Sequence, residues 1–391
     1  MAKKRKSQKS SQSSLFRQLL YLLAVLIIIL VAGLLGIDLT EEETDTVDAP
    51  AQTVAPVGSA GGTLQVFFTQ PINSNDAARH SGSSVEQALI QQIDAAQQTI
   101  DAALFELNAP DATQALVRAL ERGVQVRIVF DDEHALEDPE STAQELIEAG
   151  AQFRSDERGA FMHNKYFIFD GQAVWTGSTN ITRNGFYNNN NNAILVRSPE
   201  LVANFRADFE EMYTDGAFTR TADTRSVVNR QVQLGDTLVE TYFSPDDRDP
   251  VLARIVELVN SAQQSIRVMA FSFTLDEVGQ AMLERLSAGV AVEGVIETTG
   301  SVTSASELPR LACAGGSFRQ DGNPRIMHHK VIIIDDRIVL SGSFNFSNNA
   351  VESNSENMLI IHDPVVAAAY VAEFQARFAE GRVPPAEDLD C

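Results

Sequence analysis

The chain has 391 residues, of which 44% are hydrophobic and 21% are charged, an ordinary globular composition in a chain long enough for two structural units. The formal net charge is −23, although residues 1–17 carry six Lys or Arg with no Asp or Glu. The remainder therefore carries −29, which disfavours non-specific nucleic-acid binding unless a local basic groove exists. Two cysteines exclude a fold built on a disulfide framework.

A long uncharged segment, Leu19–Ile37, follows this basic start. At about 1.5 Å per residue its length approaches the thickness of a bilayer core, which predicts a single transmembrane helix. The basic flank before it places the N-terminus in the cytoplasm and the rest of the chain across the cell membrane. The alternative is a cleaved signal peptide, but the apolar run exceeds the usual signal core and no clear small-x-small site precedes Asp38.

The remaining sequence divides by composition and periodicity. Residues 38–63 are acidic, then rich in Ala, Pro and Gly, and predict a flexible tether. Two folded halves are expected at 64–225 and 226–391, after a basic tail at 1–18 and the membrane anchor at 19–37. The join between the halves falls in the polar, aperiodic stretch 214–238.

Helical and extended patterns alternate from the start of the first half. Residues 85–98 predict an amphipathic helix capped by the preceding serines, and residues 99–107 predict a strand. Residues 111–123 predict a second helix, ended by its last glycine, before another strand at 124–132. Helices that alternate with apolar strands favour an α/β architecture with a largely buried sheet.

The second half repeats the first. Three matched pairs of segments share an offset of 165 or 166 along the chain: 95–107 with 261–273, 116–130 with 282–296, and 201–213 with 366–378. An offset that constant indicates internal duplication. We therefore predict two similar α/β/α sandwich halves related by a pseudo-twofold axis.

Each half also carries the same polar motif: His-x-Lys, an Asp five residues after the Lys, and a later Gly-Ser-x-Asn. The members are His163, Lys165, Asp170, Ser178 and Asn180 in the first half, and His328, Lys330, Asp335, Ser343 and Asn345 in the second. The run of β-branched residues Val331–Ile334 predicts a strand, in which residues two apart share a face. His328 and Lys330 should therefore point the same way, while Asp170 and Asp335 fall on the opposite face as buried structural partners.

If the halves pack about a twofold axis, both motifs converge on one site with two imidazoles, two ammonium groups and two amides. Cleavage of a phosphodiester needs a nucleophile, an acid for the leaving oxygen and positive charge near the other phosphoryl oxygens. One histidine can attack phosphorus while the other protonates the leaving alcohol and then activates water. No metal or other cofactor is expected, because the lysines supply the charge.

The duplicated His-x-Lys-x4-Asp motif with its Gly-Ser-x-Asn extension resembles the phospholipase D superfamily, over roughly residues 64–380. The resemblance implies two α/β sandwiches facing one site, a covalent phosphohistidine and no metal cofactor. It also implies that His163 is the nucleophile and His328 the acid and base. Members often have an acidic residue downstream of each motif that orients a histidine. Here Glu356 occupies that place in the second half, and the aligned residue of the first half is taken as Asn192.

Several other polar residues have a simpler interpretation. His329 adjoins the motif on the other strand face and is expected to be structural, while His80, His134 and His362 lack any cluster around them. The asparagine run 188–192 is expected to be a polar loop, and the acidic stretch 131–138 a solvated loop without the spacing of a metal site. Trp175 is expected in the core.

The two cysteines, Cys313 and Cys391, would face an oxidising compartment in the predicted topology, so we predict that they form a disulfide that fixes the C-terminus. One chain holds both motifs, so the expected active unit is a monomer.

The sequence leaves two classes of substrate open, phospholipids and nucleic acids. The membrane anchor and acidic body favour a phospholipid, whereas the compact halves resemble the short nuclease-like and cardiolipin-hydrolase-like members, so a metal-independent nuclease acting on DNA or RNA is the alternative. A cardiolipin synthase-like transferase and a non-catalytic phosphate-binding scaffold are less favoured.

Overall fold

The computed structural model describes residues 57–59, 63–72, 74, 76, 79–218, 227–389 and 391, all within one compact unit, Thr53–Cys391. The predicted basic tail and membrane helix, and most of the tether, lie outside these residues. Within the described part of the chain, no helix is both long and apolar enough to cross a membrane. The expected boundary between the halves, at 225 and 226, also falls in a stretch that is not described.

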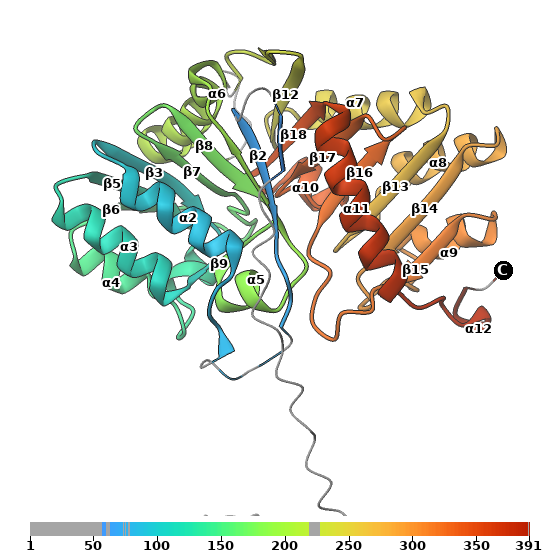
Figure 1. Ribbon diagram of the computed structural model, residues 1–391, viewed down its shortest axis with the longest axis horizontal. Helices are drawn as coiled ribbons and strands as arrows, with labels where there is room; N and C mark the ends of the chain where they lie inside the picture. Colours follow the sequence, from blue (N-terminus) through green and yellow to red (C-terminus); the bar gives the residue numbers. More distant parts are fainter. Residues whose placement is uncertain are drawn as a thin grey trace, which may run out of the picture. The chain divides into compact units, whose positions relative to one another are not determined.

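Two eight-stranded mixed sheets dominate the described chain (Figure 1). In spatial order the first consists of β1 (Val57–Ser59), β2 (Leu64–Phe68), β10 (Asn192–Val196), β8 (Ala173–Gly177), β7 (Lys165–Phe169), β3 (Thr99–Leu104), β5 (Gln125–Phe130) and β6 (Gln152–Ser155). The second consists of β11 (Gln231–Leu234), β12 (Thr237–Ser244), β18 (Glu356–His362), β17 (Ile338–Gly342), β16 (Lys330–Ile334), β13 (Ser265–Ala270), β14 (Ala291–Ile296) and β15 (Ser317–Gln320). The two orders correspond strand for strand from β2 and β12 onward, which confirms the duplication.

The predicted helices and strands of the first half form close to their expected bounds. Helix α2 (Ser84–Ala95) begins after Ser83, whose hydroxyl accepts a hydrogen bond from the Glu86 amide. Helix α3 (Pro110–Glu121) is followed by Gly123 with a φ of +85°, a backbone conformation that glycine adopts without strain. One expected strand splits, because β3 is followed by β4 (Leu107–Asn108), which pairs with β9 (Ile181–Thr182) in a separate small sheet.

Helices cover the outer faces of both sheets and also lie between them. The outer helices are α2, α3, α4 (Ala143–Glu148) and α5 (Arg183–Tyr187) in the first half, and α7 (Arg248–Ser261), α8 (Asp276–Ser287), α9 (Glu307–Cys313) and α10 (Asn348–Glu352) in the second. The inner layer holds α6 (Pro199–Glu210) and α11 (Pro364–Glu380), and α12 (Ala386–Leu389) follows near the C-terminus. Two π-helical turns, η3 (Asp132–Leu136) and η4 (Glu211–Asp215), complete the described elements.

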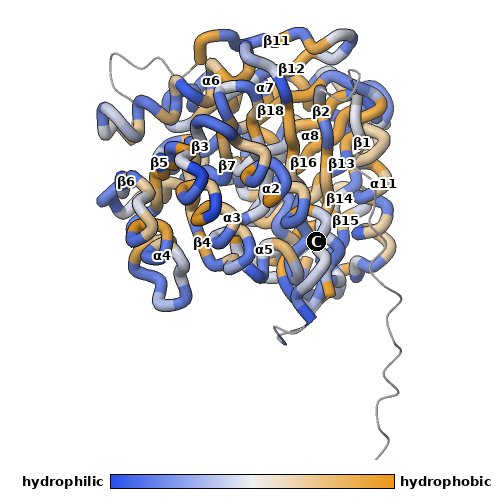
Figure 2. Tube along the Cα trace, turned by 60° about the vertical axis from the view of Figure 1, so that its left-hand side comes forward, coloured by the Kyte–Doolittle hydropathy of each residue, from blue (hydrophilic) through white to orange (hydrophobic). Residues whose placement is uncertain are grey.

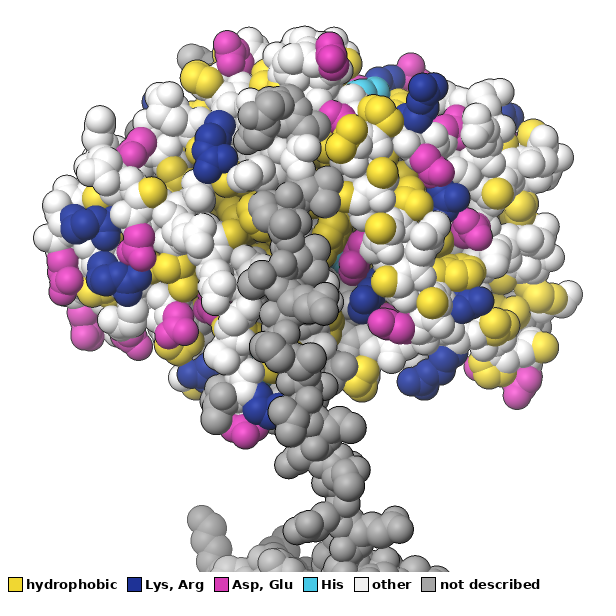
Figure 3. All heavy atoms as spheres, viewed as in Figure 1, with side chains coloured by type: hydrophobic (Ala, Val, Ile, Leu, Met, Phe, Trp, Pro, Cys, Tyr) yellow, Lys and Arg dark blue, Asp and Glu magenta, His cyan; other side chains and the backbone are white. Residues whose placement is uncertain are grey.

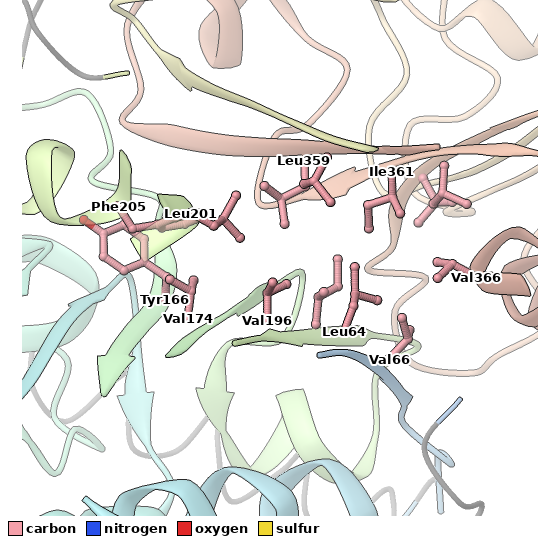
Figure 4. Close-up of a cluster of buried hydrophobic side chains, with 14 of the residues drawn as sticks. Leu64, Val66, Tyr166, Val174, Val196, Leu201, Phe205, Leu359, Ile361 and Val366 are labelled. Atoms are coloured by element: carbon pink, nitrogen blue, oxygen red, sulfur yellow. The ribbon is translucent and has the colours of Figure 1, made fainter. Parts of the chain in front are cut away.

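A single apolar core joins the inner faces of the halves. Leu64, Val66 and Val196 from the first sheet lie in the same buried cluster as Leu359 and Ile361 from the second (Figure 4). The central strands, such as β7 and β16, are fully buried and apolar after their lysines, as expected of buried sheets. Figure 2 shows hydrophobic residues gathered around the central strands β16 and β18. The fold is therefore α/β and duplicated as predicted, with helices on both faces of each sheet, and the inner helices of the two halves share one core.

The two motif aspartates have a structural role outside the shared site, as predicted, but they are not buried. Asp170 accepts hydrogen bonds from the amides of residues 97, 98 and 99, and Asp335 does the same for residues 263, 264 and 265. Both aspartates are half-exposed and have φ near +50° at the tight turn after their strand. Because each aspartate lies in a turn and not in the strand, the alternation of side chains along the strand does not set its direction. The predicted burial of the two aspartates was therefore wrong.

The structure joins Cys313, at the end of α9, to Cys391 as a disulfide with a Cα–Cα distance of 5.5 Å.

Trp175 is 1% exposed and packs on Phe67 in the core of the first half, as predicted.

Candidate active site

The two His-x-Lys motifs meet where the halves face each other. Strands β7 and β16 begin at Lys165 and Lys330, so each histidine precedes its strand instead of lying in it. Each lysine Nζ donates to the backbone oxygen of its own histidine, at 2.5 Å in the first half and 2.9 Å in the second. Both histidines line one cavity of roughly 550 Å³. The structure thus brings the two motifs together at one place, as the twofold argument required.

His163 is oriented by the opposite half. Its Nδ1 lies 2.8 Å from Glu356 Oε2, and its backbone amide donates to the oxygen of Ser355. Glu356 is fully buried at the start of β18. When Glu356 is ionised, it selects the tautomer in which Nδ1 carries the proton, so Nε2 keeps its lone pair.

His328 has the corresponding contacts with the first half, but its partner is neutral. Its amide donates to the Asn190 oxygen, and its Nδ1 lies 2.9 Å from Asn191 Oδ1 and 3.0 Å from the Ser178 oxygen. The Asn191 amide nitrogen donates to the Gly185 oxygen, which fixes Oδ1 toward the imidazole. His328 therefore also carries its proton on Nδ1, without a carboxylate to stabilise a cationic form.

The residue equivalent to Glu356 is therefore Asn191, and the expectation of Asn192 was wrong by one position. Asn192 instead contacts Nδ1 of His329 at 3.0 Å and accepts from Ser341. The offset of 165 between the two motif histidines points to Asn191 and would have found it. Neighbouring residues of an extended chain point to opposite faces, so Asn191 contacts His328 whereas Asn192 contacts His329.

The remaining motif residues surround the two histidines. Ser178 donates to Asn191 Oδ1, and Ser343 accepts from the backbone amide of Asn357. Asn180 and Asn345 both line the cavity, and Asn180 donates its amide to Glu106 at 2.5 Å. Burial raises the pKa of Glu106, although Lys165 opposes that shift. Glu106 was not expected from sequence, because the second half has Ser272 at the equivalent position.

Burial governs the protonation of the four central side chains. It lowers the pKa of His163 and of His328 well below the ordinary value, and the two buried lysines add to this effect. It also lowers the pKa of Lys165 to about 8 and that of Lys330 well below its usual range. The histidines are thus neutral near pH 7, and an anion bound between the lysines would raise their pKa values again.

Glu356 differs from an ordinary surface carboxylate. Burial raises its pKa to about 8, while Lys165 and the Ser343 hydroxyl oppose this shift. Positive charge on Lys165, or on the imidazole of His163, favours the ionised form of Glu356, because a neighbouring cation lowers the pKa of a carboxyl group. Charge that develops on His163 would therefore be balanced within the protein.

An aromatic ring covers each of the two lysines, a feature that was not predicted from the sequence. Phe105 lies over Lys165 Nζ at 4.5 Å, and Phe271 lies over Lys330 Nζ at 5.1 Å. The same rings contact His163 and His328, with centroid distances of 4.6 and 5.3 Å. Each half thus holds its motif against a phenylalanine that directly follows β3 or β13, and the two phenylalanines are themselves related by the duplication.

The expectations for the polar loops were partly wrong. His134 stacks on Phe105 at 4.4 Å and lines the cavity, and Asp131 is 2% exposed because it accepts from His134 and from the Met162 amide. The asparagine run 188–192 is buried at the contact between the halves, where Asn190 and Asn191 meet the second motif. A water-exposed loop would not have made these contacts. His80 is locally bonded, as expected, to Ser74, whereas His362 contacts Glu240, which also pairs with Arg254.

Two equivalent residues connect the halves beside the site. Arg158 donates to the Ser353 oxygen and to the Ser355 hydroxyl, next to Glu356. Asn323, its equivalent in the second half, donates to the Asn188 oxygen and to Asn190 Oδ1. Each half therefore holds the segment of the other half that carries the partner of its histidine.

A duplicated α/β fold that places two histidines, each beside a buried lysine, on one shared cavity defines the class of two-lobed, His-dependent phosphodiesterases. The family described as cardiolipin synthase, PLD-like domain, matches residues 89–213 and 255–378, once in each half. The chain belongs to this family and so to the phospholipase D superfamily, among the phosphoric diester hydrolases.

Sequence relatives match a little over one third of the chain. A mitochondrial cardiolipin hydrolase of Chlamydomonas reinhardtii is 30% identical over 35% of this chain and 71% of its own length. A phospholipase D of Rickettsia bellii is 31% identical over 38% of this chain and 72% of its length. The solved phosphatidylserine synthase of Haemophilus influenzae is 14% identical and covers 83% of this chain and 91% of its own, with a TM-score of 0.57. That last likeness concerns the fold alone.

Proposed function

We propose that this chain hydrolyses phospholipid phosphodiesters through a covalent phosphohistidine on His163, with His328 as the acid and base. The observation that carries the proposal is the pair of imidazoles in one cavity, each engaged through Nδ1 by the opposite half. Both Nε2 atoms are then the nitrogens available to substrate. One supports attack on phosphorus, and the other supports proton transfer.

In the first step, Nε2 of His163 attacks phosphorus and the bond from phosphorus to the leaving alcohol oxygen breaks. The electron pair of that bond goes to the oxygen, which takes a proton from His328 Nε2. Lys165 and Lys330 stabilise the charge on the phosphoryl oxygens, while Glu356 stabilises the positive imidazole that results. The two asparagines, Asn180 and Asn345, are placed to contact the phosphoryl group.

In the second step, His328 takes a proton from water as the water oxygen attacks phosphorus. The bond between phosphorus and His163 Nε2 breaks, and its electron pair returns to the nitrogen. The products are a phosphomonoester and the resting enzyme. His328 begins the cycle protonated, although its pKa in the free enzyme is lowered, so a bound anion that raises this pKa favours the reactive form.

The cavity lining favours a lipid over a nucleic acid. Its carboxylic acids are Glu106, Asp138 and Glu140, and the lining contains no Lys or Arg among the described residues. A polynucleotide needs cations along several phosphates, whereas one lipid phosphate needs only the two buried lysines. Basic and acidic side chains are intermixed over the face in Figure 3, which has no continuous basic area. Relatives named cardiolipin hydrolase and phospholipase D agree with this choice.

A membrane location for the enzyme is part of the proposal. Leu19–Ile37 would anchor the chain in the cell membrane, and the tether at 38–63 would leave the catalytic region on the extracytoplasmic side. The anchor and most of the tether lie outside the described residues. The anchor would hold the cavity close to lipid headgroups.

The test is to incubate the full chain, in EDTA, with ethanol and vesicles of phosphatidylcholine and phosphatidylglycerol, and separately with single-stranded DNA. Phosphatidic acid and phosphatidylethanol are the expected products, because an alcohol can replace water in the second step. A ³¹P signal or labelled phosphate retained on His163 in wild type, and absent from His163→Ala, would identify the intermediate. Cleavage of DNA alone would support the nuclease, and cleavage of neither would support a phosphate-binding scaffold.

A further inference from the structure

A second cavity of roughly 440 Å³ adjoins the active-site cavity, on the side of the second half. The two cavities share the lining residues Phe271, Ser272 and Ile326. Phe271 is also the ring that contacts His328. The second cavity therefore opens beside the histidine proposed to protonate the leaving group, not beside the nucleophile.

Aromatic rings occupy the corresponding place in the first half. Phe105, His134 and Phe161 contact one another there, with centroid distances of 4.4 Å, 4.9 Å and 5.3 Å. The equivalent positions in the second half, at the same offset of 165 or 166, are Phe271, Gly300 and Ile326. Only one of the three aromatic rings is retained.

Matching contacts confirm that these positions are equivalent. Leu104 pairs with Phe130 at the ends of β3 and β5, as Ala270 pairs with Ile296 at the ends of β13 and β14. The amides that precede the two motif histidines donate to the carboxylates that follow β5 and β14. Gly300 has a φ of +79°, and nothing lies within 4 Å of the place where a Cβ would be. The loss of two rings thus leaves open space in the second half.

The chemistry of the walls limits the occupant. Six residues carry hydroxyl groups and the rest of the surface is mainly apolar: Ser272, Thr274, Thr299, Ser301, Thr303 and Ser306, with Phe271, Phe273, Ile296 and Ile326. Among the described residues that form this lining there is no Lys or Arg. Its one acid, Glu297, already accepts from the amides of Met327 and Thr299, at 2.8 and 3.1 Å. An anion finds no cation in this lining, whereas a group with hydroxyls finds hydrogen-bonding partners in Ser272, Thr274 and Thr299. The hydroxyls of Ser301 and Thr303 already donate to the backbone oxygens of Thr298 and Gly300.

We propose that the second cavity binds the leaving alcohol of the substrate, an uncharged alcohol with further hydroxyl groups, such as glycerol. This rests on the proposed function, since it assumes that His328 serves the leaving oxygen. The site then favours a lipid whose headgroup is neutral over one whose headgroup carries another phosphate. The same cavity receives an acceptor alcohol when one replaces water.

The experiment compares two lipids that differ only in the leaving alcohol. Phosphatidylglycerol fills the second cavity, and phosphatidylmethanol releases methanol, which is too small to need it. Ile326→Phe restores the ring that the first half has at Phe161 and reduces the space. We expect kcat/KM for phosphatidylglycerol to fall about tenfold or more, with less than about a twofold change for phosphatidylmethanol. Thr303→Phe, at an exposed position of the same lining, should act in the same direction.

Val365→Phe is the matched control, because it adds the same ring at a 52% exposed position outside both cavities. Its kinetics should equal those of wild type with both lipids. Equal losses with the two lipids in Ile326→Phe and in Thr303→Phe would overturn the proposal, as would no loss in either. A wild-type preference for phosphatidylcholine that Ile326→Phe removes would overturn the neutral occupant. If wild type cleaves no phospholipid, the proposed function itself fails and this inference falls with it.

Discussion

Glu356, from the second half of the chain, holds the imidazole of His163, from the first, at 2.8 Å between Oε2 and Nδ1. The reciprocal contact places neutral Asn191 against His328. The two histidines therefore occupy equivalent positions in the fold, but one has an acidic partner and the other a neutral one. Such a difference allows one histidine to serve as the nucleophile and the other as the acid.

The first prediction concerns that carboxylate. Glu356→Gln keeps the shape of the side chain but removes the negative charge that stabilises a positive His163. We expect kcat to fall about 100-fold or more, as in other sites where an amide replaces a histidine-orienting carboxylate. Steady-state hydrolysis and the amount of phosphoenzyme trapped by acid quench measure the effect. Glu352→Gln, in an exposed pair with Arg248, is the control and should behave as wild type; a kcat within twofold of wild type in Glu356→Gln would remove Glu356 from the mechanism.

The second prediction concerns the pH profile. His328 donates a proton in the first step, so the active form is lost as pH rises through its pKa, which burial and Lys330 now hold below the ordinary value. Asn191→Asp places a carboxylate on Nδ1 and raises that pKa. The alkaline limb of kcat/KM should therefore move up by about one pH unit. The acid limb, where His163 gains a proton, should stay in place.

Thermal unfolding of Asn191→Asp provides the folding control for that profile, because the variant also loses the hydrogen bond to the Gly185 oxygen. An alkaline limb that does not move in a folded variant would show that His328 is not the acid.

The third prediction concerns a buried ion pair far from the site. Glu240, whose side chain is 2% exposed, accepts from Arg254 at 2.6 Å and contacts His362. Burial alone would raise the pKa of Glu240, but these partners lower it to about 2. The pair therefore stabilises the fold above about pH 4.3, the pKa of an unfolded glutamate, and the contribution is lost as pH falls toward 2.

Glu240→Gln should lower the free energy of unfolding by about 3 kcal/mol at pH 7, since Arg254 then lacks its buried partner. Urea unfolding at pH 7 and at pH 3 should show a smaller difference from wild type at the lower pH. Glu257→Gln removes the other, exposed partner of Arg254 and should cost less than about 0.5 kcal/mol. Equal losses for the two variants, or a difference that does not depend on pH, would contradict the argument.

The fourth prediction concerns the disulfide. Cys313 and Cys391 are separated by 78 residues, and a link of that length restricts the unfolded chain. Reduction should lower the free energy of unfolding by about 2–4 kcal/mol, and a Cys313→Ser/Cys391→Ser variant should not respond to reductant. Mass spectrometry of non-reduced peptides, from protein in its native compartment, should find the linked pair. Two free thiols there would refute the pairing.

The sequence by itself determined the duplication, the α/β class and the two histidine–lysine pairs. Those features depend on residue spacing, which survives as a constant offset of 165 or 166 along the chain. The helix caps and the strand runs are also local, so Ser83 and Gly123 lie at the expected ends. The anchor at 19–37 remains a prediction from the sequence.

Only the tertiary structure decided the partners of each histidine. Asn191, not Asn192, faces His328, because neighbouring residues on an extended chain point in opposite directions and one position decides the contact. The asparagine run is buried instead of exposed because the second half covers it. The space beside Gly300 depends on two missing rings whose neighbours are distant in sequence. Contacts across the halves depend on packing, which spacing along one chain does not specify.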